Sequence, residues 1–333
     1  MAILPEQMFI LLIFIFIIGT VFGGFLNVVI LRAFSGESIV LPPSKCPKCG
    51  NKLKWYHNIP ILSYLFLRGK CGFCKEKISI QYPIVEFITG VLFALIFLKY
   101  GIRIETLFGF IIASLLMVIS VTDIKERVVF DAHTYTFIGV GLVYALYLTV
   151  MQIVSVNQSS TNFQFTVEWI LNNPLTLSIL GGVVGALIME IAARSGYLLA
   201  GKRAFGEGDT YIAAGLGTIF GLKNILFILI LSVIIQLIFT VPMFIINLIK
   251  SKNWKTLISL SLFTLFAVLF YIMQYSTLVY NDVLRFLSIT LLAVSGIAAC
   301  IFILKGIRNE QHVTYLPFGP AMALAGLIVL LIV

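Results

Sequence analysis

The feature that most constrains this chain is a series of apolar segments, each close to the roughly 20 residues that a helix needs to cross a bilayer. Lipid offers the backbone no hydrogen bonds, so each such segment must be helical. Only 11% of the residues are charged and 60% are hydrophobic, against about 25% charged in soluble domains. This composition excludes a water-soluble enzyme. The sequence predicts an all-α polytopic membrane protein with about 8–10 transmembrane helices.

Hydropathy places ten candidate spans along the chain. The sixth is short, and Lys223 with Asn224 interrupts the apolar run before the seventh begins. The spans are residues 8–31, 83–100, 104–121, 134–154, 175–193, 210–222, 225–249, 256–279, 286–305 and 314–333.

Lys and Arg are distributed very unequally between alternate loops. The loops on one side contain nineteen of them, and the loops on the other side contain four. Cytoplasmic loops of membrane proteins carry this excess, so the first set is expected in the cytoplasm and the N-terminus outside. The first ten residues lack the basic region of a cleavable signal, so residues 1–31 are expected to remain as an anchor. The net charge of +9 therefore reports orientation, and no nucleic-acid partner is expected.

Residues 32–82 form the one long polar segment, and they contain four of the five cysteines. Cys46 and Cys49 form one CxxC pair, Cys71 and Cys74 form another, and twenty-one residues separate the pairs. This spacing is typical of a structural zinc site with four cysteine ligands. Two disulfides are the alternative, but a cytoplasmic location disfavours them. The sequence predicts a small zinc-binding cytoplasmic module, with Gly50 and Gly72 in turns that need positive φ.

Two carboxylates lie where an apolar segment meets the cytoplasmic face. Asp123 follows the third span, and Asp209 ends the motif Gly206-Glu207-Gly208-Asp209 before the sixth. Two carboxylates that share a site of low dielectric cannot both ionise, so one can act as base and the other as acid. This is the arrangement of an aspartic protease. Asp131 is expected to be a loop residue or a helper of this pair.

Each of these polar residues also has a structural explanation. Asp123 and Asp209 could cap helices or interact with the helix dipole. Glu86, just inside the second span, could stabilise a helix N-terminus, and Asn27 could form a hydrogen bond between helices. A transporter with intramembrane carboxylates is an alternative of a different class, but it needs carboxylates near the bilayer midplane and inverted repeats.

With these motifs the chain resembles the bifunctional type IV prepilin leader peptidase/N-methyltransferases, the GxGD aspartyl proteases of bacterial inner membranes. The resemblance extends from Phe22 to the C-terminal block that contains Pro320. The matching blocks are FGGFLNVVILR at 22–32, CPKC at 46–49, NIPILSYLFLRGKCGFC at 58–74, QYPIVEFITG at 81–90, Asp123 with Asp131, GEGD at 206–209 and LPFGPAMALAG at 316–326.

The resemblance implies two reactions on the cytoplasmic side of a bacterial inner membrane. Asp123 and Asp209 would cleave the basic leader of type IV prepilins or pseudopilins, with support from Gly206, Gly208 and Asp131. The new N-terminus would then be methylated with S-adenosylmethionine as the methyl donor. By the family pattern, the residues associated with methylation are Gly24, Asn27, Glu86 and the cysteine module. A peptidase without methylation is the related alternative.

The chain departs from the family pattern at three places. Phe130 stands where proline is common, Tyr211 stands where lysine is common, and the ten spans exceed the usual eight or so. The resulting division is a first helix at 1–31, the zinc module at 32–82 and a peptidase domain at 83–333. Residues from about 250 to 305 are interpreted as an extra helical pair within that domain.

Overall fold

The structure is a computed structural model that describes residues 5–41, 43–46, 48–158, 167–200, 205–250, 254–275, 290–297, 301 and 317–332. In this part of the chain the regular elements are helices, apart from two isolated antiparallel bridges, Lys45–Lys52 and Lys70–Lys77. Six helices among the described residues are long and apolar enough to cross a membrane. The all-α polytopic prediction is confirmed.

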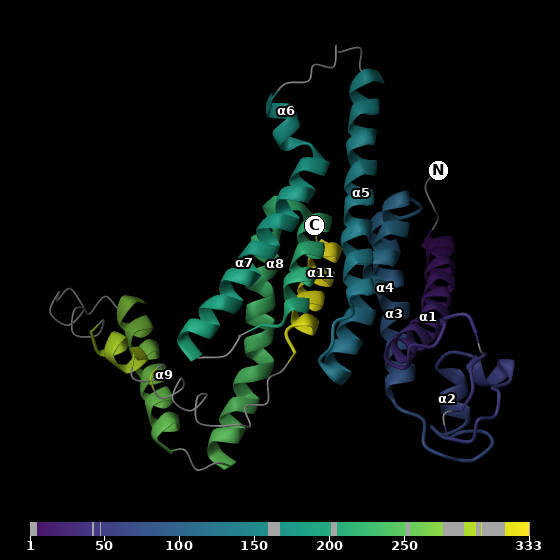
Figure 1. The fold of residues 1–333 in the computed structure, drawn as a ribbon, viewed down its shortest axis with the longest axis horizontal. Coiled ribbons are helices and arrows are strands. Elements are labelled where there is room, and N and C mark those ends of the chain that lie inside the picture. Colours follow the sequence, from purple (N-terminus) through teal and green to yellow (C-terminus); the bar gives the residue numbers. More distant parts are fainter. Residues whose placement is uncertain are drawn as a thin grey trace. The chain divides into compact units, whose positions relative to one another are not determined.

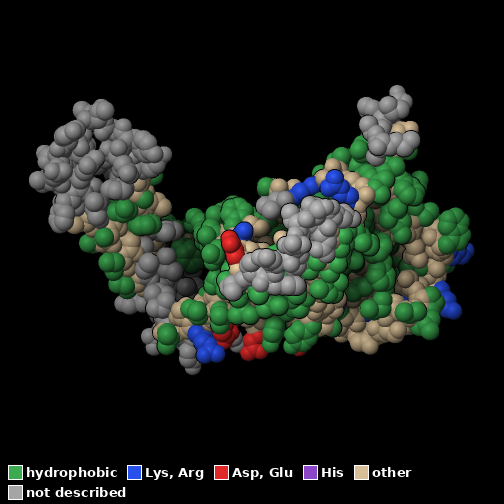
Figure 2. Space-filling model, turned by 90° about the horizontal axis from the view of Figure 1, so that it is seen from above, with side chains coloured by type: hydrophobic (Ala, Val, Ile, Leu, Met, Phe, Trp, Pro, Cys, Tyr) green, Lys and Arg blue, Asp and Glu red, His purple; other side chains and the backbone are tan. Residues whose placement is uncertain are grey.

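The chain separates into two compact units, and every predicted catalytic aspartate, methylation residue and cysteine ligand belongs to the first. The first unit comprises Met1–Glu190, Glu207–Val233 and Pro317–Val333, and the second comprises Ile191–Gly206 and Ile234–Leu316. Hydrophobic side chains form much of the visible surface in Figure 2, as expected of helices that face lipid.

Helices α1 (Pro5–Ser35) and α3 (Gln81–Tyr100) pack closely in the first unit (Figure 1). Glycines allow this approach, because a Cβ at Gly19 would lie 2.8 Å from the Cα of Gly90, and a Cβ at Gly23 would lie 2.6 Å from the Cα of Glu86. Small residues at this spacing let two membrane helices bring their backbones together. The polar module between the two helices contains η1 (Trp55–Asn58) and α2 (Leu62–Phe66).

Helix α4 (Ile104–Glu126) lies at the centre of the first unit and packs on α1, α3, α5 (Asp131–Gln158) and α11 (Gly319–Ile332). Many of its apolar side chains are buried, including Leu116 at 0% exposed. The far end of α11 is held by Lys99 Nζ and Tyr100 Oη, which donate hydrogen bonds of 2.9 and 3.0 Å to the Leu330 carbonyl. These bonds hold the C-terminal end of α11 against the end of α3. The first turn of α11 is at the opposite end of that helix, beside the last turn of α4.

Helix α8 (Glu207–Lys250) reverses direction within its length and packs against α7 (Pro174–Ala200), which follows the short α6 (Val167–Asn172). Gly221 has the non-helical angles φ 72° and ψ 174°. A Cβ at Gly185 would meet both the Ala213 carbonyl oxygen and Ile225 Cγ1, at 2.6 and 3.1 Å. A straight helix would separate those two residues by about 18 Å. The predicted interruption between the sixth and seventh spans is therefore present, but it lies at Gly221, before Lys223.

Only some of the spans predicted for the C-terminal part of the chain lie among the described residues. Helix α9 (Trp254–Tyr275) covers most of the predicted span 256–279. The predicted span 286–305 lies mainly outside the described residues. Helix α11 begins at Gly319, later than the predicted start at 314, and Pro320 is in its first turn, where a missing backbone N–H costs nothing.

Candidate functional site

Asp123 lies in the last turn of α4 and is only 5% exposed. Its Oδ2 accepts a hydrogen bond of 3.0 Å from the backbone N–H of Gly319, the first residue of α11. A helix N-terminus presents unpaired N–H groups and partial positive charge, so it stabilises a carboxylate there. The buried side chain therefore has a defined orientation, set by a residue 196 positions away in sequence.

Asp209 lies in the first turn of α8 and is 8% exposed. One turn further along, Ile212 approaches the same glycine as Asp123 does: a Cβ at Gly319 would lie 2.5 Å from Asp123 Oδ2 and 3.2 Å from Ile212 Cδ1. The last turn of α4, the first turns of α8 and the first turn of α11 thus converge on Gly319. The two aspartates are at the same end of the first unit.

Gly208 explains how the start of α8 approaches the connection between α4 and α5. A Cβ at Gly208 would lie 2.5 Å from the Cβ of Val129, closer than real Cβ atoms come. Any larger residue at 208 would push α8 away from this connection and would move the adjacent Asp209. Gly206 precedes α8 and is exposed, and its support of the peptidase site stays a prediction.

The arrangement can support acid–base chemistry on water and a carbonyl group. Two buried carboxylates at one helical junction favour a state in which one is ionised and the other protonated. The ionised group can remove a proton from water, and the protonated group can donate a proton to an oxygen that gains negative charge. Both aspartates lie at helix ends, whereas the transporter alternative required carboxylates at mid-helix depth.

Asp131, predicted as a helper, begins α5 and is exposed. The structure places Asp131 in the first turn of a helix, so the loop-residue alternative was wrong, and its role as a helper of the pair stays a prediction. The two departures from the family pattern are accommodated by aromatic contacts. The Phe130 ring lies 5.2 Å from that of Phe34 at the end of α1, and the Tyr211 ring lies 5.6 Å from that of Tyr135 on α5.

The three predicted methylation residues meet at the contact between α1 and α3. Asn27 is completely buried, and its Nδ2 donates a hydrogen bond of 3.2 Å to the Tyr82 carbonyl, so the expected bond between helices is confirmed. A Cβ at Gly24 would lie 3.6 Å from Glu86 Oε1. The other oxygen, Glu86 Oε2, accepts a hydrogen bond of 2.7 Å from the backbone N–H of Ile61.

The Ile61 contact is a feature that the sequence did not reveal. Ile61 has φ 60° and ψ −52°, a conformation that β-branched residues rarely adopt. It immediately precedes α2, so the Glu86 carboxylate fixes the polar module to α3 at a strained position. Ile61 belongs to the block NIPILSY, which matches the family pattern, but the sequence alone did not indicate what Ile61 contacts.

The four cysteines of the polar module form one cluster. Their Sγ atoms all lie within 4.8 Å of one another, and the Sγ atoms of Cys46 and Cys74 are 3.9 Å apart. Tetrahedral zinc with Zn–S bonds of about 2.3 Å requires sulfur atoms roughly 3.8 Å apart, so the donor set fits a structural zinc ion. Backbone N–H groups of Cys74 and Phe73 donate hydrogen bonds to Cys71 and lower the pKa of its thiol to about 7. A thiolate is therefore favoured at Cys71, whereas burial and the neighbouring cysteines raise the pKa of the Cys74 thiol to about 11.

The two cysteine pairs fold into similar turns with different residues at the strained position. Gly50 has φ 70°, as predicted, and its N–H donates a hydrogen bond of 2.9 Å to the Cys46 carbonyl. In the second turn the left-handed residue is Lys75, with φ 60°, and its N–H bonds to the Cys71 carbonyl. The prediction for Gly72 was wrong: its φ is not in this region, and a Cβ there would come within 3.0 Å of His57 Nε2.

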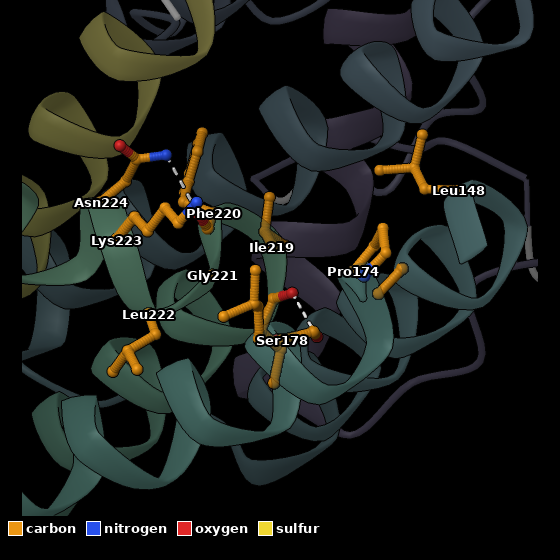
Figure 3. A pocket seen from close by; sticks show the side chains of 12 residues that line it. Leu148, Pro174, Ser178, Ile219, Phe220, Gly221, Leu222, Lys223 and Asn224 are labelled. Carbon is orange, nitrogen blue, oxygen red and sulfur yellow. Dashed lines mark hydrogen bonds between the residues drawn. The ribbon is translucent and has the colours of Figure 1, made fainter. Parts of the chain in front are cut away.

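A cavity of about 210 Å³ lies between α5, α7 and the reversal in α8 (Figure 3). Ser178 borders it and donates a hydrogen bond to the Thr218 carbonyl, and Lys223 and Asn224 line it where the second half of α8 begins. Asp209 is at the opposite end of the first half of α8. This cavity is therefore separate from the aspartate junction.

Comparison with known proteins identifies similar chains. Residues 17–100 match a family model described as the bacterial peptidase A24 N-terminal domain, and residues 110–241 match one described as the type IV leader peptidase family. No solved structure is significantly similar.

Curated relatives named prepilin leader peptidase/N-methyltransferase show substantial identity. The chain is 32% identical to the protein from Neisseria gonorrhoeae over 68% of this chain and 80% of the relative. It is 31% identical to the Klebsiella pneumoniae protein, over 62% and 84% of the two chains. It is also 31% identical to the Myxococcus xanthus protein, over 66% of this chain but only 59% of the relative.

Proposed function

Because the chain belongs to the type IV leader peptidase family, we propose that Asp123 and Asp209 are the catalytic pair of a prepilin leader peptidase. The observation that carries the assignment is the meeting of both aspartate-bearing turns at Gly319. We propose that the enzyme removes the leader peptide of prepilins and methylates the new N-terminus, which fits the name prepilin leader peptidase/N-methyltransferase of its relatives.

In the proposed reaction one aspartate is ionised and removes a proton from the attacking water. The other is protonated and donates a hydrogen bond to the oxygen of the scissile carbonyl, which becomes negative in the tetrahedral intermediate. Collapse of that intermediate transfers a proton to the leaving amine and breaks the C–N bond. The Gly319 N–H holds Asp123 in place throughout.

We assign the methylation step to the contact between α1 and α3. S-adenosylmethionine, which the N-methyltransferase name implies, carries positive charge, and the Glu86 carboxylate beside the small Gly24 is suited to a cation. Asn27 fixes the start of α3 relative to α1. The four-cysteine zinc site holds the fold of the module that Glu86 attaches to α3.

The protein is a multi-pass membrane protein, and we propose that it lies in the bacterial inner membrane with the aspartates and the zinc module facing the cytoplasm. The Lys and Arg distribution of nineteen against four supports this orientation. The proposed substrates are type IV prepilins or pseudopilins, whose apolar helix would enter from the lipid.

The test is mass spectrometry of a purified prepilin after incubation with the full-length protein and S-adenosylmethionine. Asp123→Asn and Asp209→Asn should each abolish leader removal, while Asp131→Asn, an exposed control of the same chemistry, should retain most of it. Leader removal by both buried-site variants at the wild-type rate would refute the assignment. The mass of the product reports methylation in the same experiment.

A further inference from the structure

We propose that the four-cysteine module docks on the anionic headgroup layer of the membrane that its flanking helices span. The contact is a surface, here called the docking surface, formed by η1, α2 and the second cysteine turn. It consists of Lys54, Trp55, Tyr56, Leu65, Phe66 and Phe73. This proposal does not depend on the proposed function, because it concerns residues away from the aspartate junction.

Large apolar side chains on the docking surface are unusually exposed. Phe66 is 83% exposed, Trp55 is 78% exposed and Leu65 is 63% exposed. In a module of about 45 residues that also has to fold, clustered apolar exposure of this kind marks an interaction site. Lipid contact already accounts for exposed apolar residues on the spanning helices, but these three lie in the polar module between spans.

Ring contacts connect the exposed aromatic residues of the docking surface. The Trp55 ring lies 5.7 Å from that of Tyr56, and the Tyr56 ring lies 4.5 Å from that of His57. The His57 ring lies 5.3 Å from that of Phe73, which connects η1 to the second cysteine turn. Helix α2, which carries Leu65 and Phe66, contacts η1 directly.

The charge of the module suits an anionic surface. Residues 36–80 contain eight Lys and Arg residues against two acidic ones. Zinc bound by four thiolates adds two negative charges, so a clear positive excess remains. One of the lysines, Lys54, lies with its Nζ 5.7 Å from the Tyr56 ring centroid, so positive charge and aromatic surface are adjacent. Tryptophan, tyrosine and lysine together are the residues that favour the membrane–water interface.

The position of the module in the chain brings it to the headgroup layer. It begins directly after α1, which ends at Ser35, and it ends where α3 begins at Gln81. Exposed apolar side chains reach the start of α3, because Ile80, the last residue of the module, is 64% exposed and Ile84 on α3 is 46% exposed. The module therefore lies beside the ends of α1 and α3 from which it extends (Figure 1), and its exposed apolar residues continue onto the start of α3.

The experiment uses the full-length protein with Trp169 and Trp254 replaced by phenylalanine, so that Trp55 is the only tryptophan. The protein is reconstituted in nanodiscs of phosphatidylcholine alone or with added phosphatidylglycerol, each with and without brominated lipid. Docking predicts that anionic lipid shifts Trp55 emission to the blue, increases quenching by brominated lipid severalfold and decreases quenching by acrylamide.

The matched variants each remove one positive charge, one on the docking surface and one far from it in the chain. Lys54→Gln should weaken the docking equilibrium roughly fivefold, whereas Lys223→Gln, which changes the exposed lysine at the α8 reversal, should leave it unchanged. Zinc content verifies that the module is folded in each sample. Trp55 that remains open to acrylamide in anionic nanodiscs would overturn the proposal. So would protection that requires a prepilin peptide and occurs equally without anionic lipid, since the partner would then be a protein.

Discussion

The backbone amide of Gly319 donates a 3.0 Å hydrogen bond to the carboxylate of Asp123, across 196 residues of sequence. This bond joins the last turn of α4 to the first turn of α11 and gives a buried aspartate one orientation. The same glycine is in contact range of Ile212 on α8, so it connects the two turns that carry Asp123 and Asp209. The C-terminal block at 316–326 therefore contributes to the site, because its Gly319 orients Asp123.

Gly319→Ala should impair cleavage without unfolding the protein. The new Cβ would lie 2.5 Å from Asp123 Oδ2, so the carboxylate must move, at a cost of about 1–3 kcal/mol for overpacking. We expect the rate of leader removal to fall at least tenfold, a change that corresponds to about 1.4 kcal/mol. Gly139→Ala is the matched control, because its Cβ would meet no atom within 4 Å, and it should cleave normally.

Gly208→Ala should also reduce cleavage, through contact with Val129. The added Cβ would come within 2.5 Å of the Val129 Cβ and would displace the first turn of α8 together with Asp209. Val129→Gly removes that obstacle in a non-helical connection. The double variant should therefore cleave better than Gly208→Ala alone, as a double-mutant cycle of initial rates would measure. Strictly additive losses would show that the clash is not the cause.

Removal of zinc should unfold the polar module but leave the helices of the first unit assembled. Cys46→Ser should lower the zinc content of the purified protein from one ion per chain towards zero and should abolish methylation. Cys300→Ser replaces a cysteine outside the described residues and serves as the control, with full zinc content expected. Elemental analysis and product mass measure both effects. Wild-type methylation by zinc-free Cys46→Ser protein would contradict this prediction.

Glu86→Ala should release the segment that precedes α2. The variant loses the acceptor for the Ile61 N–H, a charge-assisted bond worth about 1.5–3 kcal/mol when it is shielded from water and less where it is partly exposed. Hydrogen exchange should increase at the Ile61 amide, and methylation should fall while cleavage continues. Glu86→Gln keeps an acceptor oxygen and should protect the amide partially. Unchanged exchange in Glu86→Ala would exclude Glu86 as the attachment point of the module.

Much of the architecture was predictable because it depends on local properties of the sequence. Runs of apolar residues identify spanning helices wherever they occur, since lipid satisfies no backbone hydrogen bond. Two CxxC pairs identify a four-thiolate cluster, because each pair forms its own turn, and the four Sγ atoms do lie within 4.8 Å. The few acidic residues at span borders, together with the GxGD motif and the placement of both aspartates at one face, indicated Asp123 and Asp209 as candidates.

The sequence by itself determined the helical class, the cysteine cluster and the candidate aspartates, whereas the tertiary structure decided which other residues contact and position these groups. The contacts between Gly319 and Asp123, Gly208 and Val129, and Glu86 and Ile61 join segments that are distant in the chain. No periodicity or spacing encodes such pairs, because the closeness of a backbone amide or a missing Cβ depends on how whole helices pack. The local pattern thus specifies the chemical groups, and helix packing specifies their geometry.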